Sequence, residues 1–517
     1  MNAEYAPSAS PGDLSGLLHA ATAAWERKDF PTCIEALQHA SRLAPSNCDI
    51  LVQLGRIHGL RYDYAAAESC FEKALRLAPG KTALLTNIGT HCRNFRDQTL
   101  AERYLRRALE QADATPLACI KLAELYERLR RLPEAADLVA KALHLQPAHP
   151  AALLARARLD RLAGNLEPAE QQLRSLLGRA IQDPWIHAQA WYELATVLDR
   201  QEKFDDAMAA LLAAKSLLKP HAPPYLAESQ KMRARLKAIE SGISSEMFRH
   251  WSANGPALTP PRRLALLCGY VRSGTTLLEQ VLDSHPDIVS AEETTVFLDD
   301  ALPPLRRDSP PDSGLLPVLD TASNPSLEKS RTAYFRSLEL SLGHPIAGRL
   351  PLDKNPALTY LIPGFLRVFP ETKFLIVLRD PRDVVLSCFL QTQPLSPATV
   401  ANLTLTGAIE DYTSHLSLWR KLAPSLPVPH LEVRYEDMVA DLESVARQTL
   451  AFLGLTWDPR VLGFARHARE KMVRSPTYAD VTQPVYQRAR GRWRHYQKHL
   501  EPHLEKLEPF VKAFGYD

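Results

Sequence analysis

The chain has 517 residues, more than one hydrophobic core ordinarily organises, so we expect two or three domains. Hydrophobic residues make up 45% and charged residues 23%, which is typical of a soluble globular protein. The net charge of +3 excludes a strongly basic protein, so we expect no nucleic-acid partner. Residues 1–13 lack the pattern of a signal peptide, and no apolar run approaches the roughly 20 residues that span a bilayer.

The seven cysteines are scattered along the chain and form no Cys-x-x-Cys pair. Most of them lie in apolar helical patterns, which favours buried, reduced thiols over a zinc site. We therefore expect a cytoplasmic protein without a transmembrane segment.

A period of 34 residues runs through the first half of the chain. Small residues recur at this step in three series: Ala40, Ala74, Ala108 and Ala142; Ala67, Ala101, Ala135 and Ala169; and Gly55, Gly89, Ala123 and Ala157. This period is that of the tetratricopeptide repeat, and residues 14–220 resemble that family over about six repeats. The resemblance implies antiparallel helix pairs that stack into an all-α superhelix with a groove. The fold alone leads us to expect a protein partner in this groove, and the sequence does not identify the residues that line it.

Residues 221–261 are predicted to form a linker between two domains. A Pro-rich break at 221–224 ends the repeats, residues 225–239 have the pattern of one amphipathic helix, and three prolines in 255–261 mark the next boundary. The remaining residues, 262–517, have a plausible length for one further domain.

The second domain opens with a phosphate-binding pattern. Residues 264–268 are apolar and predict a buried parallel strand, while 275–282 predict a helix. Between them, Gly269 and Gly274 have the spacing of a nucleoside triphosphate loop, in which backbone N–H groups at the helix start bind the anion. Thr275 stands where such a loop has lysine, which argues against ATP or GTP hydrolysis and against a kinase. Arg272 supplies the cation instead, which suits a nucleotide with a single 5′-phosphate.

This loop resembles the 5′-phosphosulfate loop of sulfotransferases, which use PAPS (3′-phosphoadenosine 5′-phosphosulfate). The string from Arg272 to Thr294 looks most like the protein-tyrosine sulfotransferases and the bacterial proteins that join tetratricopeptide repeats to this domain. The resemblance covers about residues 262–517. It implies a P-loop-like α/β domain with a central parallel sheet. The residues it assigns to the 5′ end of the donor are Arg272, Ser273, Gly274, Thr275 and Thr276.

A second motif supports the first. Residues 373–378 predict another buried strand, followed by Arg379 and, eight positions on, Ser387. The resemblance implies that these two bind the donor's 3′-phosphate, and a guanidinium with a hydroxyl suits a doubly charged anion. Tyr435, at a predicted strand end, is a candidate for stacking on adenine. The basic stretch 488–494 is either a solvated face or a further contact to the 3′-phosphate.

The resemblance also implies the catalytic residues. Glu293 aligns with the family's base, with Glu292 as the next candidate; Lys354 would stabilise the bridging oxygen, assisted by Ser475. Gln483 stands where the tyrosine-directed enzymes have lysine, which puts that contact in doubt. We expect no metal, because lysine and arginine supply the positive charge.

We therefore predict a PAPS-dependent sulfotransferase that transfers a sulfuryl group to an acceptor hydroxyl, with the repeats recruiting a partner or substrate. A tyrosyl peptide, a glycan or a lipid head group all remain open as acceptors. Asp299 and Asp300 follow the glutamates, so an acidic peptide is not supported locally, although Arg306 and Arg307 come soon after. The alternative is an interaction scaffold whose second domain binds a nucleotide without catalysis. The oligomeric state is open.

Overall fold

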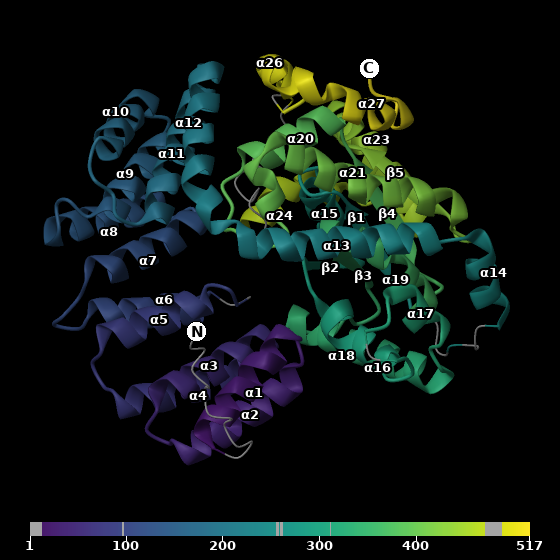
Figure 1. Cartoon of the computed structure of the whole chain (residues 1–517), viewed down its shortest axis with the longest axis horizontal. Coiled ribbons are helices and arrows are strands. Elements are labelled where there is room, and N and C mark those ends of the chain that lie inside the picture. Colours follow the sequence, from purple (N-terminus) through teal and green to yellow (C-terminus); the bar gives the residue numbers. More distant parts are fainter. Residues whose placement is uncertain are drawn as a thin grey trace, which may run out of the picture. The chain divides into compact units, whose positions relative to one another are not determined.

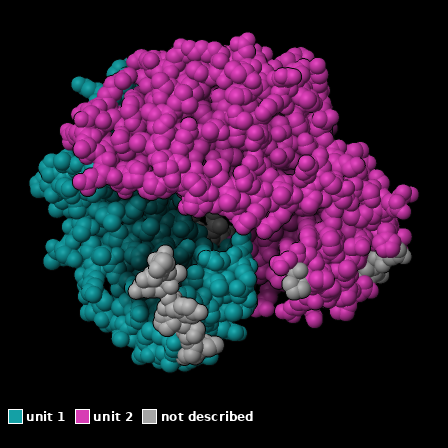
Figure 2. All heavy atoms as spheres, in the orientation of Figure 1, with its two compact units in different colours: residues 1–172 teal, residues 173–517 magenta. Residues whose placement is uncertain are grey.

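The computed structural model describes residues 13–95, 98–254, 258, 262–310, 312–470, 487 and 489–517. The chain divides into two compact units, residues 1–172 and 173–517, which Figure 2 shows in different colours. The division falls inside the predicted repeat array, so the last helix pair of the array belongs to the same unit as the C-terminal domain. The domain limits 14–220, 221–261 and 262–517 stay predictions.

The first unit consists of helices packed in consecutive pairs (Figure 1). Small residues allow the helices of a pair to approach closely. A Cβ on Gly55 would lie 2.5 Å from Cε1 of Phe71, and one on Gly89 would lie 2.6 Å from Cγ of Leu105. The helices are α1 (Leu14–Glu26), α2 (Phe30–Leu43), α3 (Cys48–Leu60), α4 (Tyr64–Leu77), α5 (Thr82–Cys92), α6 (Thr99–Leu109), α7 (Pro116–Arg128), α8 (Leu132–Leu145), α9 (Pro150–Ala163) and α10 (Leu166–Leu177), which crosses the limit of the unit.

The second helix of several pairs ends where the sequence predicts. Helices α2 and α4 each end two residues before a proline, Pro45 and Pro79, and α8 ends two residues before Pro147. Proline has no N–H to continue the helical hydrogen bonding. Together with the small-residue interfaces, this confirms the expected all-α repeat architecture.

The second unit begins with four helices: α11 (Pro184–Arg200), α12 (Phe204–Leu218), α13 (Pro223–Gly242) and α14 (Ser245–Asn254). The amphipathic helix predicted at 225–239 lies within α13. Helix α13 packs along α21 (Leu405–Leu422), where Arg233 and Glu410 form an ion pair of 2.8 Å. Among the described residues, none of the helices is both long and apolar enough to cross a membrane.

A five-stranded parallel sheet forms the centre of the second unit, as the sequence predicts. The strand order is β2-β3-β1-β4-β5, so β1 lies between β3 and β4 and the order reverses there. Ligands of such sheets bind beyond the carboxyl ends of the strands at this reversal. The strands are β1 (Ala265–Gly269), β2 (Ile288–Glu292), β3 (Leu350–Lys354), β4 (Lys373–Leu378) and β5 (His430–Arg434).

Helices cover both faces of the sheet. Alternate strand residues such as Leu267, Leu352 and Val377 share one core with α15 (Thr275–Asp283), α22 (Tyr435–Ala440), α23 (Leu442–Leu453) and α24 (Phe464–Glu470). Helices α18 (Asn324–Leu342) and α21 pack on the opposite face. Tyr334 on α18 donates to a carboxylate on β3, and Trp419 on α21 donates to a carboxylate on β5. The other α-helices in the described part of this unit are α16 (Leu302–Arg306), α17 (Leu315–Asp320), α19 (Ile362–Val368), α20 (Pro381–Leu390), α26 (Gln497–Leu500) and α27 (Leu504–Ala513). Its 3₁₀ helices include η3 (Pro356–Leu361), η4 (Val400–Leu403) and η7 (Arg492–Tyr496).

A buried lysine joins the helix pair α11–α12 to the sheet domain. The Nζ of Lys215, on α12, donates to the carbonyl of Asn402 at 2.5 Å and lies 4.0 Å from the ring centre of Phe389 on α20. Burial lowers the pKa of Lys215 to about 7. In the unfolded chain the same amine keeps its ordinary pKa near 10.5.

We expect this lysine to make stability depend on pH. Below about pH 7 the amine is charged in both the folded and the unfolded chain, so the folded protein bears the full cost of burying that charge. Between pH 7 and 10.5 the unfolded chain binds more protons than the folded one, so the free energy of unfolding rises with pH by up to about 1.4 kcal/mol per pH unit. Thermal unfolding of the wild type and Lys215→Met from pH 7 to 9 should show the wild type gaining on the variant. Lys219→Met, on an exposed neighbouring lysine, is the control and should show no such trend. A difference that stays constant with pH would contradict this assignment.

Candidate active site at the carboxyl edge of the sheet

The glycine loop after β1 is shaped by two close approaches. Gly269 has a φ of +150°, and a Cβ there would lie 2.5 Å from the carbonyl oxygen of Val377. Gly274 has a φ of +102°, and a Cβ there would lie 2.6 Å from Cδ2 of Tyr435. Helix α15 begins at the next residue, so its N-terminal N–H groups and its dipole face the loop. The side chains of Ser273, Thr275 and Thr276 are buried beside it.

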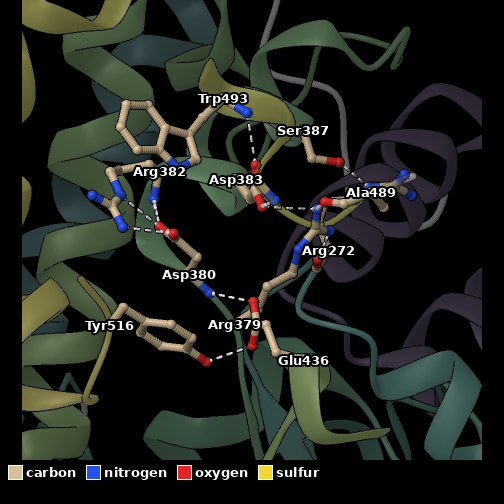
Figure 3. A network of polar contacts seen from close by, with 11 residues as sticks. Arg272, Arg379, Asp380, Arg382, Asp383, Ser387, Glu436, Ala489, Trp493 and Tyr516 are labelled. Carbon is tan, nitrogen blue, oxygen red and sulfur yellow. Dashed lines mark hydrogen bonds and ion pairs between the residues drawn. The ribbon is translucent and has the colours of Figure 1, made fainter. Parts of the chain in front are cut away.

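The structure brings the two predicted anion motifs into direct contact (Figure 3). The Nε of Arg272 donates to Oγ of Ser387 at 3.0 Å, across 115 residues of chain. The Nη1 of Arg379 donates to the carbonyl oxygen of Arg272 at 3.0 Å. The loop after β1 and the helix after β4 therefore form one cluster, with two guanidinium groups and a hydroxyl.

Arg379 is well placed to bind an anion. It is nearly buried, its Nη2 donates to the carbonyl of Ala489 at 2.6 Å, and Asp383 lies 3.8 Å away. Its buried Nε–H makes no hydrogen bond to any residue that the structure describes. A buried donor without an acceptor is costly, and a phosphate oxygen would satisfy it. The residues present thus fit a phosphate group.

Tyr435 lies beneath this cluster. Its ring centre is 4.8 Å from the guanidinium carbon of Arg379, and its ring packs against Gly274 and the core on that face of the sheet. These contacts position the arginine and fill the space that Gly274 leaves. The stacking of Tyr435 on adenine stays a prediction.

On the other side of β1, Lys354 lies among three carboxylates. Its Nζ is 2.9 Å from Glu293, 3.1 Å from Glu279 and 3.8 Å from Glu292, and its side chain is fully buried. Burial opposes the charge on this lysine, but the carboxylates outweigh it, led by Glu279 and then Glu293, and hold the pKa of Lys354 above its ordinary value. The carboxylates therefore favour the protonated form of Lys354 at the end of β3.

Exposure separates the three carboxylates. The side chain of Glu279 is 0% exposed and that of Glu292 is 5%, whereas that of Glu293 is 38% exposed. Glu293 also has a φ of +50°, which is unusual for a residue other than glycine, and its N–H donates to the carbonyl of Lys354 at 2.7 Å. This backbone turns the Glu293 carboxylate toward solvent, where an acceptor can reach it.

The sequence did not predict two buried acids close to Lys354. Glu279, on α15, contacts Lys354 and accepts from Oγ of Ser290. Asp353 faces the opposite side of β3, where it accepts from Tyr334 and Thr294, and burial raises its pKa to about 7. A charged residue within the apolar pattern of α15 was the available signal for Glu279. For Asp353 no signal distinguished it from a solvated strand end.

Part of the predicted site lies outside the described residues. This applies to Ser475, Gln483 and the first residue of the basic stretch, Arg488. Within the described part of that stretch, Arg492 forms an ion pair of 2.6 Å with Asp199 on α11, and the guanidinium of Arg494 lies over the ring of Trp493.

Comparison with known proteins places the sheet domain in a family. A family model described as "Sulfotransferase family" matches residues 265–459, and two described as "Tetratricopeptide repeat" match 49–81 and 120–184. Residues 265–459 belong to the sulfotransferase family, and tetratricopeptide repeats precede them. Both resemblances seen in the sequence are thereby confirmed.

Several curated proteins are similar to this chain. An uncharacterized protein of Aquifex aeolicus is 25% identical over 79% of this chain and 52% of its own length. Protein-tyrosine sulfotransferase 1 of Danio rerio is 27% identical over 49% of this chain and 72% of its own, and that of Homo sapiens is 30% identical over 38% and 53%. The chain thus spans about half the length of two of these three relatives.

Two solved sulfotransferase domains are also similar to this chain. The domain from the Synechococcus PCC 7002 olefin synthase is 19% identical, with a TM-score of 0.35, and covers 51% of this chain and 98% of its own. The domain from the curacin biosynthetic pathway is 17% identical, with a TM-score of 0.31, and covers 50% and 99%.

We expect the ion cluster of the sulfotransferase domain to contribute to stability in an uneven way. Lys354→Met removes the cation that lies 3.1 Å from the fully buried Glu279, which should cost about 3–5 kcal/mol of unfolding free energy, because removing one partner of a buried ion pair is expensive. Glu293→Gln, on the half-exposed partner, should cost far less. The double variant Lys354→Met with Glu279→Met should recover much of the loss. Thermal unfolding measures all three, and equal losses for the two single variants would contradict the expectation.

Proposed function

We propose that this protein transfers a sulfuryl group from PAPS to an acceptor hydroxyl. The observation that carries the proposal is the contact among Arg272, Arg379 and Ser387, which joins two anion-binding motifs at one edge of the sheet. A nucleotide with phosphates at both its 5′ and 3′ positions suits such a pair of motifs. The membership of residues 265–459 in the sulfotransferase family supports the same assignment.

In the proposed reaction, the loop N–H groups with Arg272 bind the 5′-phosphate, and Arg379 with Ser387 binds the 3′-phosphate. The acceptor oxygen attacks sulfur while its proton passes to the Glu293 carboxylate. The bond between sulfur and the bridging oxygen breaks, and that oxygen leaves with the 5′-phosphate. Lys354 stabilises the negative charge that develops there. Arginine and lysine thus supply the positive charge that a metal would otherwise provide.

The buried Glu279 allows Glu293 to leave Lys354 and act as the base. Lys354 contacts both carboxylates, at 3.1 Å and 2.9 Å. If Glu293 turns from Lys354 to an acceptor hydroxyl, Glu279 remains as the counter-ion and keeps the lysine charged. Glu292, which is largely buried, is less suited to reach an acceptor, which favours Glu293 of the two candidate bases.

A tyrosyl hydroxyl is the acceptor to test first. The curated relatives named protein-tyrosine sulfotransferases carry this suggestion, at 24–30% identity. The repeats would recruit the protein that bears the acceptor, or another partner, because arrays of this kind present an extended groove. Glycans and lipid head groups are the comparison acceptors in the same assay.

Nucleotide binding tests the donor assignment. We expect PAP, the desulfated product, to bind the wild type tightly and to bind Arg379→Ala about 100-fold more weakly, since a charge-assisted contact to phosphate is lost. Isothermal titration calorimetry with PAP and with ATP measures this. Arg447→Ala, in an exposed pair with Glu443, is the control and should bind PAP like the wild type. Equal or tighter binding of ATP would contradict the proposal.

Turnover tests the base. Glu293→Gln should bind PAP normally but transfer sulfate about 10²–10⁴ times more slowly, which is the usual contribution of a general base. Radiolabelled PAPS with a tyrosyl peptide measures the rate, and Glu292→Gln in the same assay decides between the two glutamates. Unchanged turnover of Glu293→Gln would remove it from the mechanism. Tight PAP binding by a wild type that transfers to none of the acceptors would favour the non-catalytic scaffold instead.

A further inference from the structure

The last repeat pair holds a segment from the far end of the chain. Asp199, at the end of α11, accepts a hydrogen bond from the Tyr496 hydroxyl at 2.6 Å. It also forms an ion pair of 2.6 Å with Nη2 of Arg492. Tyr496 is fully buried, whereas the side chains of Arg492 and Asp199 are 33% and 18% exposed. The ring of Phe204, at the start of α12, stacks on His495 with 4.4 Å between the ring centres. The hairpin α11–α12 thus fixes η7 by polar and aromatic contacts together.

The same segment reaches the anion cluster from its other side. The N–H groups of Gly491 and Trp493 donate to the two oxygens of Asp383, at 2.7 Å and 2.8 Å. Two residues before Gly491, the carbonyl of Ala489 accepts from Nη2 of Arg379. Figure 3 shows Asp383 between Trp493 and the Arg379–Ala489 contact. Asp383 is itself fully buried and lies 3.8 Å from Arg379.

A chain of contacts therefore runs from the repeat hairpin to Arg379. Residues 489–496 have two anchors, Asp199 on the hairpin and Asp383 on α20. Arg379 donates one of its hydrogen bonds to this segment, so the position of the Ala489 carbonyl sets the direction of the guanidinium. An anion site needs its donors held closely in place, because a small displacement weakens charge-assisted hydrogen bonds.

The hairpin also supports the other half of the cluster. Lys215 on α12 packs over Phe389, two positions beyond Ser387 on α20. Both groups assigned to the 3′-phosphate, Arg379 and Ser387, thus depend on elements that contact α11–α12. This accounts for the inclusion of the hairpin in the same compact unit as the sheet domain.

We infer that Asp199 is a positioning residue for the site that binds the donor's 3′-phosphate, and that the hairpin α11–α12 is a structural part of that site. This inference rests on the proposed use of PAPS. In this inference the last helix pair of the predicted array supports nucleotide binding, which differs from the partner binding expected of the repeats. Asp199 does not touch the nucleotide; it acts through Arg492 and Tyr496, then through the backbone of residues 489–493.

The test compares two nucleotides that differ in the group concerned. PAP carries the 3′-phosphate and adenosine 5′-monophosphate lacks it. In the full chain, Asp199→Asn should bind PAP about tenfold more weakly, roughly the loss of one well-aligned hydrogen bond, and bind adenosine 5′-monophosphate as the wild type does. Asp205→Asn is the matched control, because Asp205 lies on the same hairpin and pairs with Lys498 at 2.6 Å on the exposed rim. It should leave both affinities unchanged.

The two nucleotides distinguish a failure of the positioning role of Asp199 from a failure of the proposed donor. An Asp199→Asn protein that binds PAP like the wild type, or that loses both nucleotides by the same factor, overturns the positioning role. A wild type that does not prefer PAP overturns the proposed donor instead. If Asp199→Asn does not fold, Tyr496→Phe decides by the same ratio, since it removes only the hydroxyl that donates to Asp199.

Discussion

The central position of β1 in the parallel sheet determines how the site is built. Because β3 and β4 flank β1, the groups at their carboxyl ends, Lys354 and Arg379, lie on either side of the loop that follows β1. The close fit of Gly269 against Val377 and of Gly274 against Tyr435 then fixes the path of that loop. A larger residue at either glycine would move the loop away from both neighbours.

The two sides of the loop differ in charge. On the β4 side, Arg272 donates to Ser387, and Arg379 donates to the carbonyl of Arg272 and lies 3.8 Å from Asp383. On the β3 side, one lysine lies among three carboxylates, and only Glu293 is substantially exposed. The first arrangement suits a bound anion and the second suits proton transfer. In the proposed reaction the nucleotide and the acceptor would occupy the cationic and the acidic side respectively.

The predicted repeat array contains helix pairs with two kinds of neighbour. The helices before residue 172 form a compact unit of their own, in which glycines allow close contact within the pairs α3–α4 and α5–α6. The pair α11–α12 packs instead with the sheet domain, through Lys215, Asp199 and Phe204. The same local pattern of alanines and leucines thus occurs both in a separate helical unit and in a helix pair that packs on the sheet domain.

The sequence alone determined the features that depend on neighbouring positions. A period of 34 predicted the helix pairs, two apolar runs predicted β1 and β4, and the spacing of Gly269 and Gly274 predicted the anion loop between strand and helix. These are local signals, because backbone geometry and hydrophobic periodicity act over a few residues. Family resemblance added the roles of Glu293, Lys354 and Arg379, which no local pattern supplies.

Only the tertiary structure decided which charges meet. Glu279 and Lys354 are 75 positions apart, and Asp199 and Arg492 nearly 300, so no spacing in the sequence links them. The packing of α15 beside β3 buries Glu279 against the lysine, and the partner of this carboxylate is known only from that packing. The physical reason is that burial and ion pairing depend on which elements pack together, and packing is a property of the whole fold.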